Sequence, residues 1–172
     1  MAQDEGRFGR ISDVRRAWAP ADIRPVSAGQ IVREYLYVFA AVCPSLGKMT
    51  ALILPYANTG MMNLFLAEVA AEYSDYLVIM LMDQAGWHMS KSLRVPENIR
   101  ILPQPAHSPE LNPVEHLWEE IREKHFYNRA FRTLDEVENT LCRAIKYIAD
   151  APERLSSMTN FPYLRNTSLN AT

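Results

Sequence analysis

The stretch Leu77-Val78-Ile79-Met80-Leu81-Met82-Asp83-Gln84-Ala85-Gly86-Trp87-His88 gives the clearest indication of the fold. Its first six residues are all apolar, which is typical of a strand buried on both faces in the middle of a covered sheet. Asp83 follows this strand and is itself followed by a turn of small residues. Because ligands of open α/β sheets gather at the carboxyl ends of strands, Asp83 is a candidate site residue. The alternative is that Asp83 only caps the next element.

A second stretch, Ser108-Pro109-Glu110-Leu111-Asn112-Pro113-Val114-Glu115-His116-Leu117-Trp118, predicts a helix that starts after a proline-rich loop. Asn112 can cap this helix, and Pro113 suits its first position because no amide donor is needed there. Glu115 then lies near the positive end of the helix dipole. It either closes a capping box or contributes a second carboxylate to a site.

A third acidic element, the pair Asp4-Glu5, lies near the start of the chain, just before Gly6. Taken alone, a carboxylate so close to a terminus is most simply a terminal surface charge. Neighbouring residues of a strand point to opposite faces, so only one of Asp4 and Glu5 can face a site.

The remaining pattern predicts an α/β fold in which a mixed five-stranded sheet is flanked by helices. The expected strands, of which the first three form an antiparallel meander, cover residues 7–18, 32–42, 49–54, 77–82 and 99–102. The expected helices cover residues 59–73, with Thr59 as the cap, and 88–93, 113–124 and 133–149, the last with a Thr133 capping box. One further turn of helix is expected after Pro152.

Together, the three acidic segments resemble the insertion sequence 630 family of transposases, part of the mariner-related superfamily. The segment Asp4-Glu5-Gly6-Arg7-Phe8 matches the first motif of that family, and Asp83 to His88 matches the second. The third motif is present without a break from Ser108 to Glu115. The similarity extends from Met1 to about Asp150.

The resemblance implies a ribonuclease-H-like catalytic domain over residues 1–150, followed by a tail over residues 151–172. Its function would be metal-dependent DNA strand cleavage and strand transfer during transposition. Asp4, Asp83 and Glu115 would form an Asp-Asp-Glu triad that holds two Mg²⁺ or Mn²⁺ ions, with Asp4 bridging both. Carboxylates suit these ions, which prefer oxygen ligands. Three such carboxylates are expected to raise one another's pKa and to form the site poorly without the ions.

Several nearby residues are candidates for DNA contact. A basic strip beside Asp4 is opposed by Asp13 alone and can lie along a DNA backbone or form a solvated hairpin face; it consists of Arg7, Arg10, Arg15 and Arg16. His88 is a further candidate for DNA contact, but it can instead orient the turn that follows Asp83.

Length and charge limit these expectations. The chain has 172 residues, enough for one domain, and a formal net charge of −2, whereas DNA binding relies on Lys and Arg. Relatives carry a helix-turn-helix DNA-binding region before the nuclease, and this chain does not. Recognition of transposon ends is therefore expected to come from a separate or frameshift-fused polypeptide, and a homodimer is expected by resemblance. Reduced cysteines and the absence of a membrane span or signal peptide indicate the bacterial cytoplasm, at the nucleoid when bound to DNA.

The sequence departs from the family at its start, where Met1, Ala2 and Gln3 alone precede Asp4. The first strand is therefore expected to be truncated, with ladder bonds lost on both sides. A late start codon, a second reading frame and decay are all compatible with this. Two alternatives to an active transposase follow: a non-catalytic remnant with the same fold, and a general structure-specific nuclease.

Overall fold

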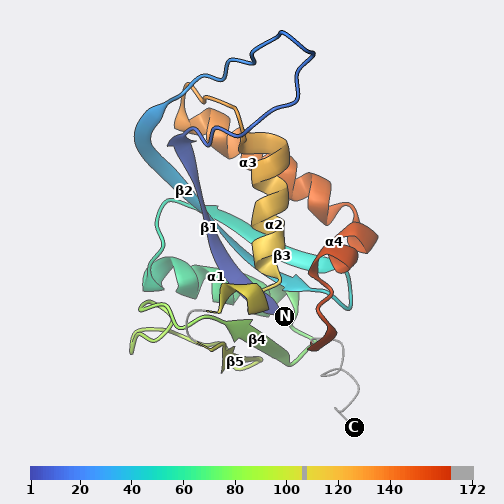
Figure 1. The fold of residues 1–172 in the computed structure, drawn as a ribbon. Helices are drawn as coiled ribbons and strands as arrows, with labels where there is room; N and C mark the ends of the chain where they lie inside the picture. The colour runs from blue at the N-terminus through green and yellow to red at the C-terminus, as the bar shows by residue number, and fades with distance from the viewer. Residues whose placement is uncertain (106–107, 164–172) are drawn as a thin grey trace.

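One mixed sheet of five strands organises the chain, with the strand order β3-β2-β1-β4-β5 (Figure 1). The computed structural model describes residues 1–105 and 108–163. An antiparallel meander is formed by β1 (Ala2–Ile11), β2 (Ile31–Cys43) and β3 (Lys48–Leu54). The strands β4 (Val78–Met82) and β5 (Ile99–Pro103) continue the sheet parallel to β1. The predicted mixed five-stranded sheet is thus confirmed.

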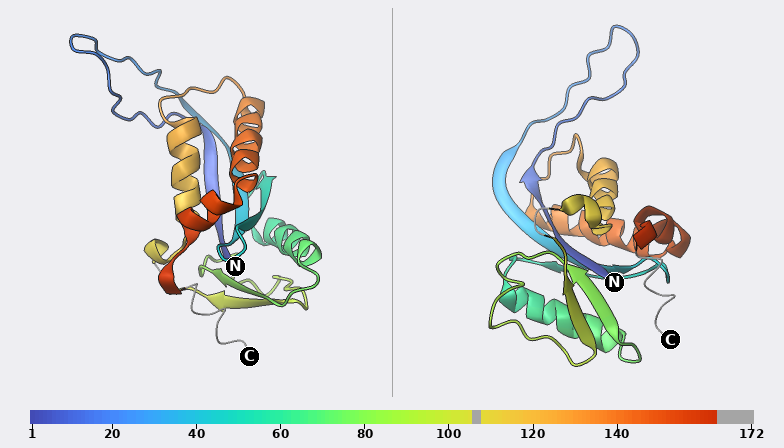
Figure 2. Two further views of the ribbon diagram at one scale, coloured as in Figure 1. Left: turned by 90° about the vertical axis from the view of Figure 1, so that its right-hand side faces the viewer. Right: turned by 60° about the horizontal axis from the view of Figure 1, so that its bottom comes forward.

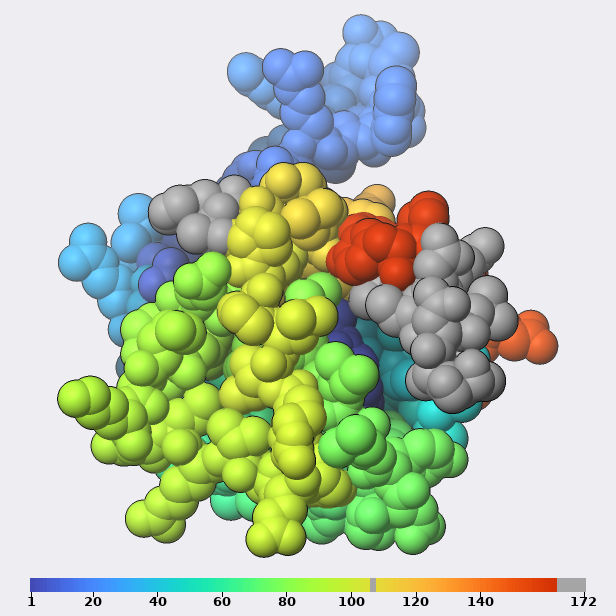
Figure 3. Space-filling model, turned by 90° about the horizontal axis from the view of Figure 1, so that it is seen from below, coloured from blue at the N-terminus to red at the C-terminus, as the bar shows by residue number. Residues whose placement is uncertain are grey.

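The first strand differs from its prediction. It runs from Ala2 to Ile11, so Asp4 lies within it, and the expected continuation to Trp18 is wrong. Residues 12–30 instead form an arm that stands apart from the body (Figure 3). The Ser12 hydroxyl donates to the Arg129 carbonyl and the Arg15 amide donates to Asn128 Oδ1, so the chain after Ile11 bonds to the loop before α3 (Leu134–Ala149).

The strand β1 has a long ladder with β2 and only a short one with β4. Toward β2, the ladder runs from Ala2 opposite Val42 to Ile11 opposite Ile31, with one register shift near its end. Toward β4, the register consists of the pair Ala2 and Leu81. The α-amino group of Met1 donates to the Ile79 carbonyl (2.6 Å), which extends this contact. The expected loss of ladder bonds on both sides of the first strand is therefore wrong on the β2 side, where pairing extends from Ala2 to Ile11.

Helices cover both faces of the sheet (Figures 1 and 2). One face packs against α1 (Thr59–Glu72), and the other packs against α2 (Val114–Ile121), α3 (Leu134–Ala149) and α4 (Pro152–Thr159). The strand β2 contributes to both cores because its side chains alternate: Val38 faces the α2 side and Phe39 faces α1. The site therefore rests on a sheet that is packed from both sides.

Local signals placed most helix ends correctly. The Thr133 hydroxyl accepts a hydrogen bond from the Glu136 amide at the start of α3, as predicted. Helix α1, however, is capped by Asn58, whose side chain accepts from the Met61 amide, and the Thr59 hydroxyl donates to the Trp87 carbonyl.

Other helical segments depart from the predicted pattern. The predicted helix over residues 88–93 is replaced by turns. The expected helix over residues 113–124 is divided, because α2 follows a 3₁₀ turn, η1 (Pro109–Leu111), and passes into a π-helical turn, η2 (Arg122–Phe126). Within the described ranges, none of the helices combines the length and apolar character that crossing a bilayer requires.

Candidate active site

Asp4, Asp83 and Glu115 line the same cavity, whose volume is about 300 Å³. Asp4 comes from β1, Asp83 from the end of β4 and Glu115 from the first turn of α2. The other residues of the wall are mostly polar and come from the turn after β4 and the loop before α2: Gln84, Ala85, Gln104, Pro105, Ser108, Pro109 and Asn112. The fold thus brings the three predicted carboxylates to one place.

The three carboxylates share this cavity without converging on one point. Among residues 1–105 and 108–163, no three His, Cys, Asp or Glu side chains cluster tightly enough to hold a single metal ion. A pair of ions needs less convergence, because each ion can be held by a different subset of the carboxylates.

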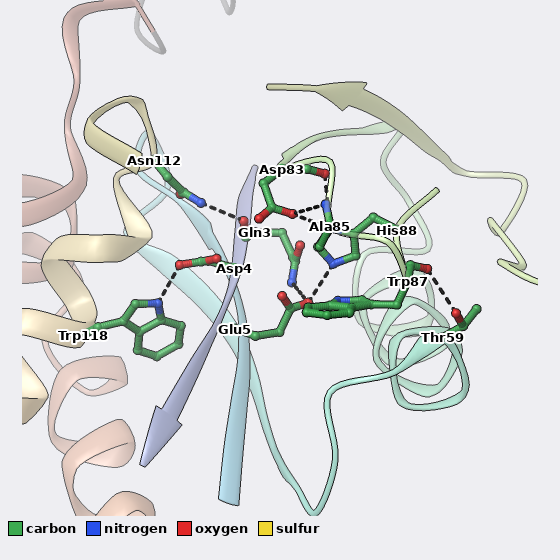
Figure 4. A network of polar contacts seen from close by, with 10 residues as sticks. All are labelled: Gln3, Asp4, Glu5, Thr59, Asp83, Ala85, Trp87, His88, Asn112 and Trp118. Carbon is green, nitrogen blue, oxygen red and sulfur yellow. Dashed lines mark hydrogen bonds and ion pairs between the residues drawn. The ribbon is translucent and has the colours of Figure 1, made fainter. Parts of the chain in front are cut away.

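Asp4 lies in an environment that disfavours its charge. Burial and the nearby Glu115 and Glu5 carboxylates raise the pKa of Asp4 to about 7, against the opposing effect of hydrogen bonds from the Trp118 side chain and the Glu5 backbone. The indole Nε1 of Trp118 donates to Asp4 Oδ2 (2.7 Å; Figure 4). The sequence indicated that Trp118 packs against the sheet, and its buried ring confirms this, but the hydrogen bond was not foreseen.

The environment of Glu115 also disfavours a negative charge. Burial raises the pKa of Glu115, Glu119 and Asp83 raise it further, and only Arg122 lowers it. Two of the three carboxylates therefore lie where a negative charge is disfavoured, and their oxygens are ligands that suit hard divalent cations. The side chains present fit a Mg²⁺ or Mn²⁺ site.

The environment of Asp83, in contrast, favours the charged carboxylate. The hydrogen bond from His88 is the main cause that lowers the pKa of Asp83, and the Ala85 amide also donates to it. The His88 Nδ1 lies 2.6 Å from Asp83 Oδ1, and the Ala85 amide lies 3.0 Å from the same oxygen. The expectation that all three carboxylates raise one another's pKa is therefore wrong for Asp83, because the imidazole of His88 lies beside it and lowers its pKa.

His88 lies inside the protein, beneath the cavity. Its side chain is 1% exposed, and its Nε2 lies 2.9 Å from Glu5 Oε1. Burial lowers the pKa of His88, but the hydrogen bonds to Asp83 and Glu5 outweigh this and raise the pKa to about 9. A ring so deeply buried offers no surface to DNA. Its second predicted role, orienting the turn after Asp83, agrees with the contact between Nδ1 and the Asp83 carbonyl (3.1 Å).

Asn112 joins the start of α2 to β1. Its Oδ1 accepts from the Val114 amide (3.1 Å), which agrees with the predicted capping role. Its Nδ2 also donates to the carbonyl of Gln3 (3.0 Å), the residue before Asp4. This buried side chain therefore connects the segments that carry Asp4 and Glu115.

The four arginines of the predicted basic strip are divided between two elements. Arg7 and Arg10 lie on β1, and Arg15 and Arg16 lie in the arm. Arg10 is occupied by Glu34 and by the Phe131 carbonyl.

The other three arginines are exposed. Arg7 stacks over the ring of Tyr35, and Arg15 pairs with Asp13. Arg10 and Arg15 of the predicted strip are therefore each paired with a carboxylate, Glu34 and Asp13 respectively.

This sheet order, with helices on both faces, is that of the ribonuclease-H-like catalytic domains of transposases, so the predicted fold is confirmed. Residues 1–138 match the family described as DDE superfamily endonuclease, and the chain belongs to that family. It is 39% identical over 125 residues to the uncharacterized protein y4pE/y4sA of Sinorhizobium fredii (strain NBRC 101917 / NGR234). The aligned region covers 72% of this chain and 93% of that protein.

Solved structures of the Mos1 transposase share the fold. The paired-end complex with the left transposon end has a TM-score of 0.69 at 17% identity, covering 92% of this chain and 50% of that chain. The paired-end complex with Mg has a TM-score of 0.65 at 14% identity, covering 98% and 53%. The complex with Mn has a TM-score of 0.60 at 18% identity, covering 93% and 55%. The chain thus spans about half the length of the Mos1 chains that it matches.

Proposed function

We propose that this chain is the catalytic domain of a transposase of the insertion sequence 630 family, which cuts and joins DNA strands with the help of divalent metal ions. The observation that carries the proposal is the single cavity lined by Asp4, Asp83 and Glu115. Family membership and the unbroken motif from Ser108 to Glu115 also support it.

The three carboxylates would hold two Mg²⁺ or Mn²⁺ ions in this cavity. When bound, such ions activate the attacking oxygen and stabilise the leaving oxygen of a phosphodiester. The chain's own residues fix the geometry: Trp118 holds Asp4, His88 holds Asp83, and the first turn of α2 presents Glu115. The raised pKa values of Asp4 and Glu115 favour a cation in the cavity, because it would compensate their charge.

DNA is the proposed substrate, at transposon ends and target sites in the bacterial cytoplasm. The exposed arginines Arg7, Arg15 and Arg16 would contribute phosphate contacts, with Arg10 after release from Glu34. The solved neighbours include Mos1 complexes with transposon ends and a strand transfer complex, which supports DNA binding here. A homodimer is proposed from the family resemblance alone. A helix-turn-helix polypeptide, separate or fused, would supply recognition of specific ends.

The test is strand nicking of supercoiled DNA and of end-labelled duplexes, with Mg²⁺ or Mn²⁺ and with EDTA. We expect metal-dependent nicking that falls to the EDTA level in Asp4→Asn, Asp83→Asn and Glu115→Gln. The matched control is Glu110→Gln, which alters an exposed carboxylate of the same motif that does not line the cavity. Nicking unchanged in Asp83→Asn or Glu115→Gln would contradict the assigned roles.

Two other outcomes separate the alternatives. A folded wild-type chain that never nicks DNA, even with a helix-turn-helix partner, would favour a non-catalytic remnant. Nicking of any branched or flapped DNA, without joining of the freed 3′ end to a target, would favour a structure-specific nuclease.

A further inference from the structure

We propose that Glu5 and His88 act as a buried relay that positions Asp83 for metal binding, which makes both of them positioning residues of the active site. The inference rests on the proposed function. It concerns two buried side chains that do not line the cavity.

The relay is a continuous chain of short contacts. His88 Nδ1 lies 2.6 Å from Asp83 Oδ1, and His88 Nε2 lies 2.9 Å from Glu5 Oε1. The Nε2 of Gln3 donates to the same Glu5 oxygen at 2.8 Å, which fixes the carboxylate from the other side. Figure 4 shows Glu5 and Asp83 approaching the His88 ring from opposite sides.

Burial distinguishes this arrangement from a surface ion pair. The side chains of His88 and Glu5 are 1% and 6% exposed, whereas that of Asp83 is 51% exposed. A half-exposed carboxylate at a strand end would sample several rotamers by itself. His88 and the Ala85 amide both bond to Oδ1, so they hold the carboxylate in one orientation while Oδ2 takes part in neither contact.

The alternation of β1 explains why Asp4 and Glu5 are adjacent. Neighbouring residues of a strand point to opposite faces, so Asp4 points to Trp118 on α2 while Glu5 points to His88 on the α1 side (Figure 4). The dipeptide Asp4-Glu5 therefore contacts both of the other acidic segments: Asp4 contacts the one that carries Glu115, through Trp118, and Glu5 contacts the one that carries Asp83, through His88. Outer partners of this kind typically change metal affinity by about 10- to 100-fold when they are replaced.

The experiment measures Mn²⁺ binding to the intact chain by the EPR signal of free Mn²⁺, together with the free energy of unfolding in urea. The amide nitrogen of Asn can replace Nδ1 of a histidine, and that of Gln can replace Nε2. His88→Asn therefore retains a donor for Asp83, whereas His88→Gln retains a donor for Glu5. We expect His88→Gln to weaken Mn²⁺ binding by about 10- to 100-fold and His88→Asn to remain closer to wild type.

Glu5→Gln tests the anchor of the relay, and Glu34→Gln is its matched control. Glu34 also forms an ion pair on the sheet, with Arg10, but it lies outside the relay. We expect weaker Mn²⁺ binding in Glu5→Gln and unchanged binding in Glu34→Gln. Equal affinities for His88→Asn and His88→Gln at equal stability would overturn the relay, because a purely structural role depends on filled volume and not on which donor remains.

A second readout separates the relay from the proposed function. In the metal-free chain, the ¹⁵N NMR shifts of the two His88 ring nitrogens report their hydrogen bonds, so Glu5→Gln should move the Nε2 signal and Glu34→Gln should leave both signals unchanged. Failure of the wild type to bind Mn²⁺ would contradict the proposed function, and the NMR comparison would then decide on the relay. An Nε2 signal that Glu5→Gln leaves unchanged would overturn it.

Discussion

The indole Nε1 of Trp118 donates a 2.7 Å hydrogen bond to Oδ2 of Asp4, across the contact between α2 and β1. The tryptophan ring is buried against Phe8, with ring centroids 5.9 Å apart. Asp4 is therefore held by an aromatic residue that also belongs to the core. Packing of this helix against the sheet and orientation of the first carboxylate depend on the same side chain.

Replacing Trp118 by Phe should separate these two roles. The ring remains apolar, so the loss of stability should be modest, about 1 to 2 kcal/mol for one buried hydrogen bond. The bond lowers the pKa of Asp4, so its removal should raise that pKa and weaken Mn²⁺ binding more at pH 6 than at pH 8. Mn²⁺ titrations at both pH values check this. Trp18→Phe, at a fully exposed position, is the control and should bind Mn²⁺ like wild type.

The raised pKa of Asp4 predicts a dependence of stability on pH in metal-free buffer. The pKa is about 7 in the folded chain and has an ordinary value of 3.8, so the folded state binds the proton more tightly. Stability from this group is present below pH 3.8 and is lost as the pH rises through 7. Wild type should lose stability relative to Asp4→Asn between pH 5 and pH 8, on the order of 2 kcal/mol. Urea unfolding with EDTA measures this difference, and a pH-independent difference would refute the assigned pKa.

Gly6 lies between Asp4 and Phe8 on β1, against the Trp118 ring. A Cβ at this position would lie 2.7 Å from Phe8 Cε2 and 2.8 Å from Trp118 Cδ2. Gly6→Ala should therefore displace buried rings, cost about 1 to 3 kcal/mol of stability and weaken Mn²⁺ binding. Gly29→Ala is the control, because no atom lies within 4 Å of its Cβ position. Equal stability of the two variants, measured by urea unfolding, would show that the Phe8 and Trp118 rings can move to accommodate the methyl group.

Asn112 and Asn58 allow a matched comparison of two helix caps. Asn58 caps α1 away from the cavity, whereas Asn112 bonds to the start of α2 and to the Gln3 carbonyl. Each Asn→Ala variant should lose about 1 kcal/mol from the cap. Only Asn112→Ala should also reduce Mn²⁺ affinity and nicking, because it frees β1 from α2. Similar losses of activity in both variants would point to general destabilisation.

Much of the fold follows from local sequence patterns. The apolar run from Val78 to Met82, the Thr133 cap and the β-branched and aromatic residues of β2 each act over a few residues, and each gave the correct element. The end of β1 and the turns after His88 were missed because long-range contacts decide them. Residue Ser12 bonds to the Gln30 carbonyl and to the Arg129 carbonyl, which no nearby pattern indicates.

The same division applies to the candidate site. Its three carboxylates were identified because each lies in a recognisable motif. The contacts that hold two of them were not, since Trp118 is 114 residues from Asp4 and His88 is 83 residues from Glu5. A signal existed in the adjacent acidic pair, because strand alternation required the second carboxylate to face a different partner. The identity of that partner depended on tertiary packing.

The brief pairing of β1 with β4, at Ala2 and Leu81, has a mechanical consequence. Few backbone hydrogen bonds join the strand that carries Asp4 to the strand that ends before Asp83, so the spacing of these two carboxylates depends on side chains brought from other elements: Trp118 for Asp4, and His88 for Asp83.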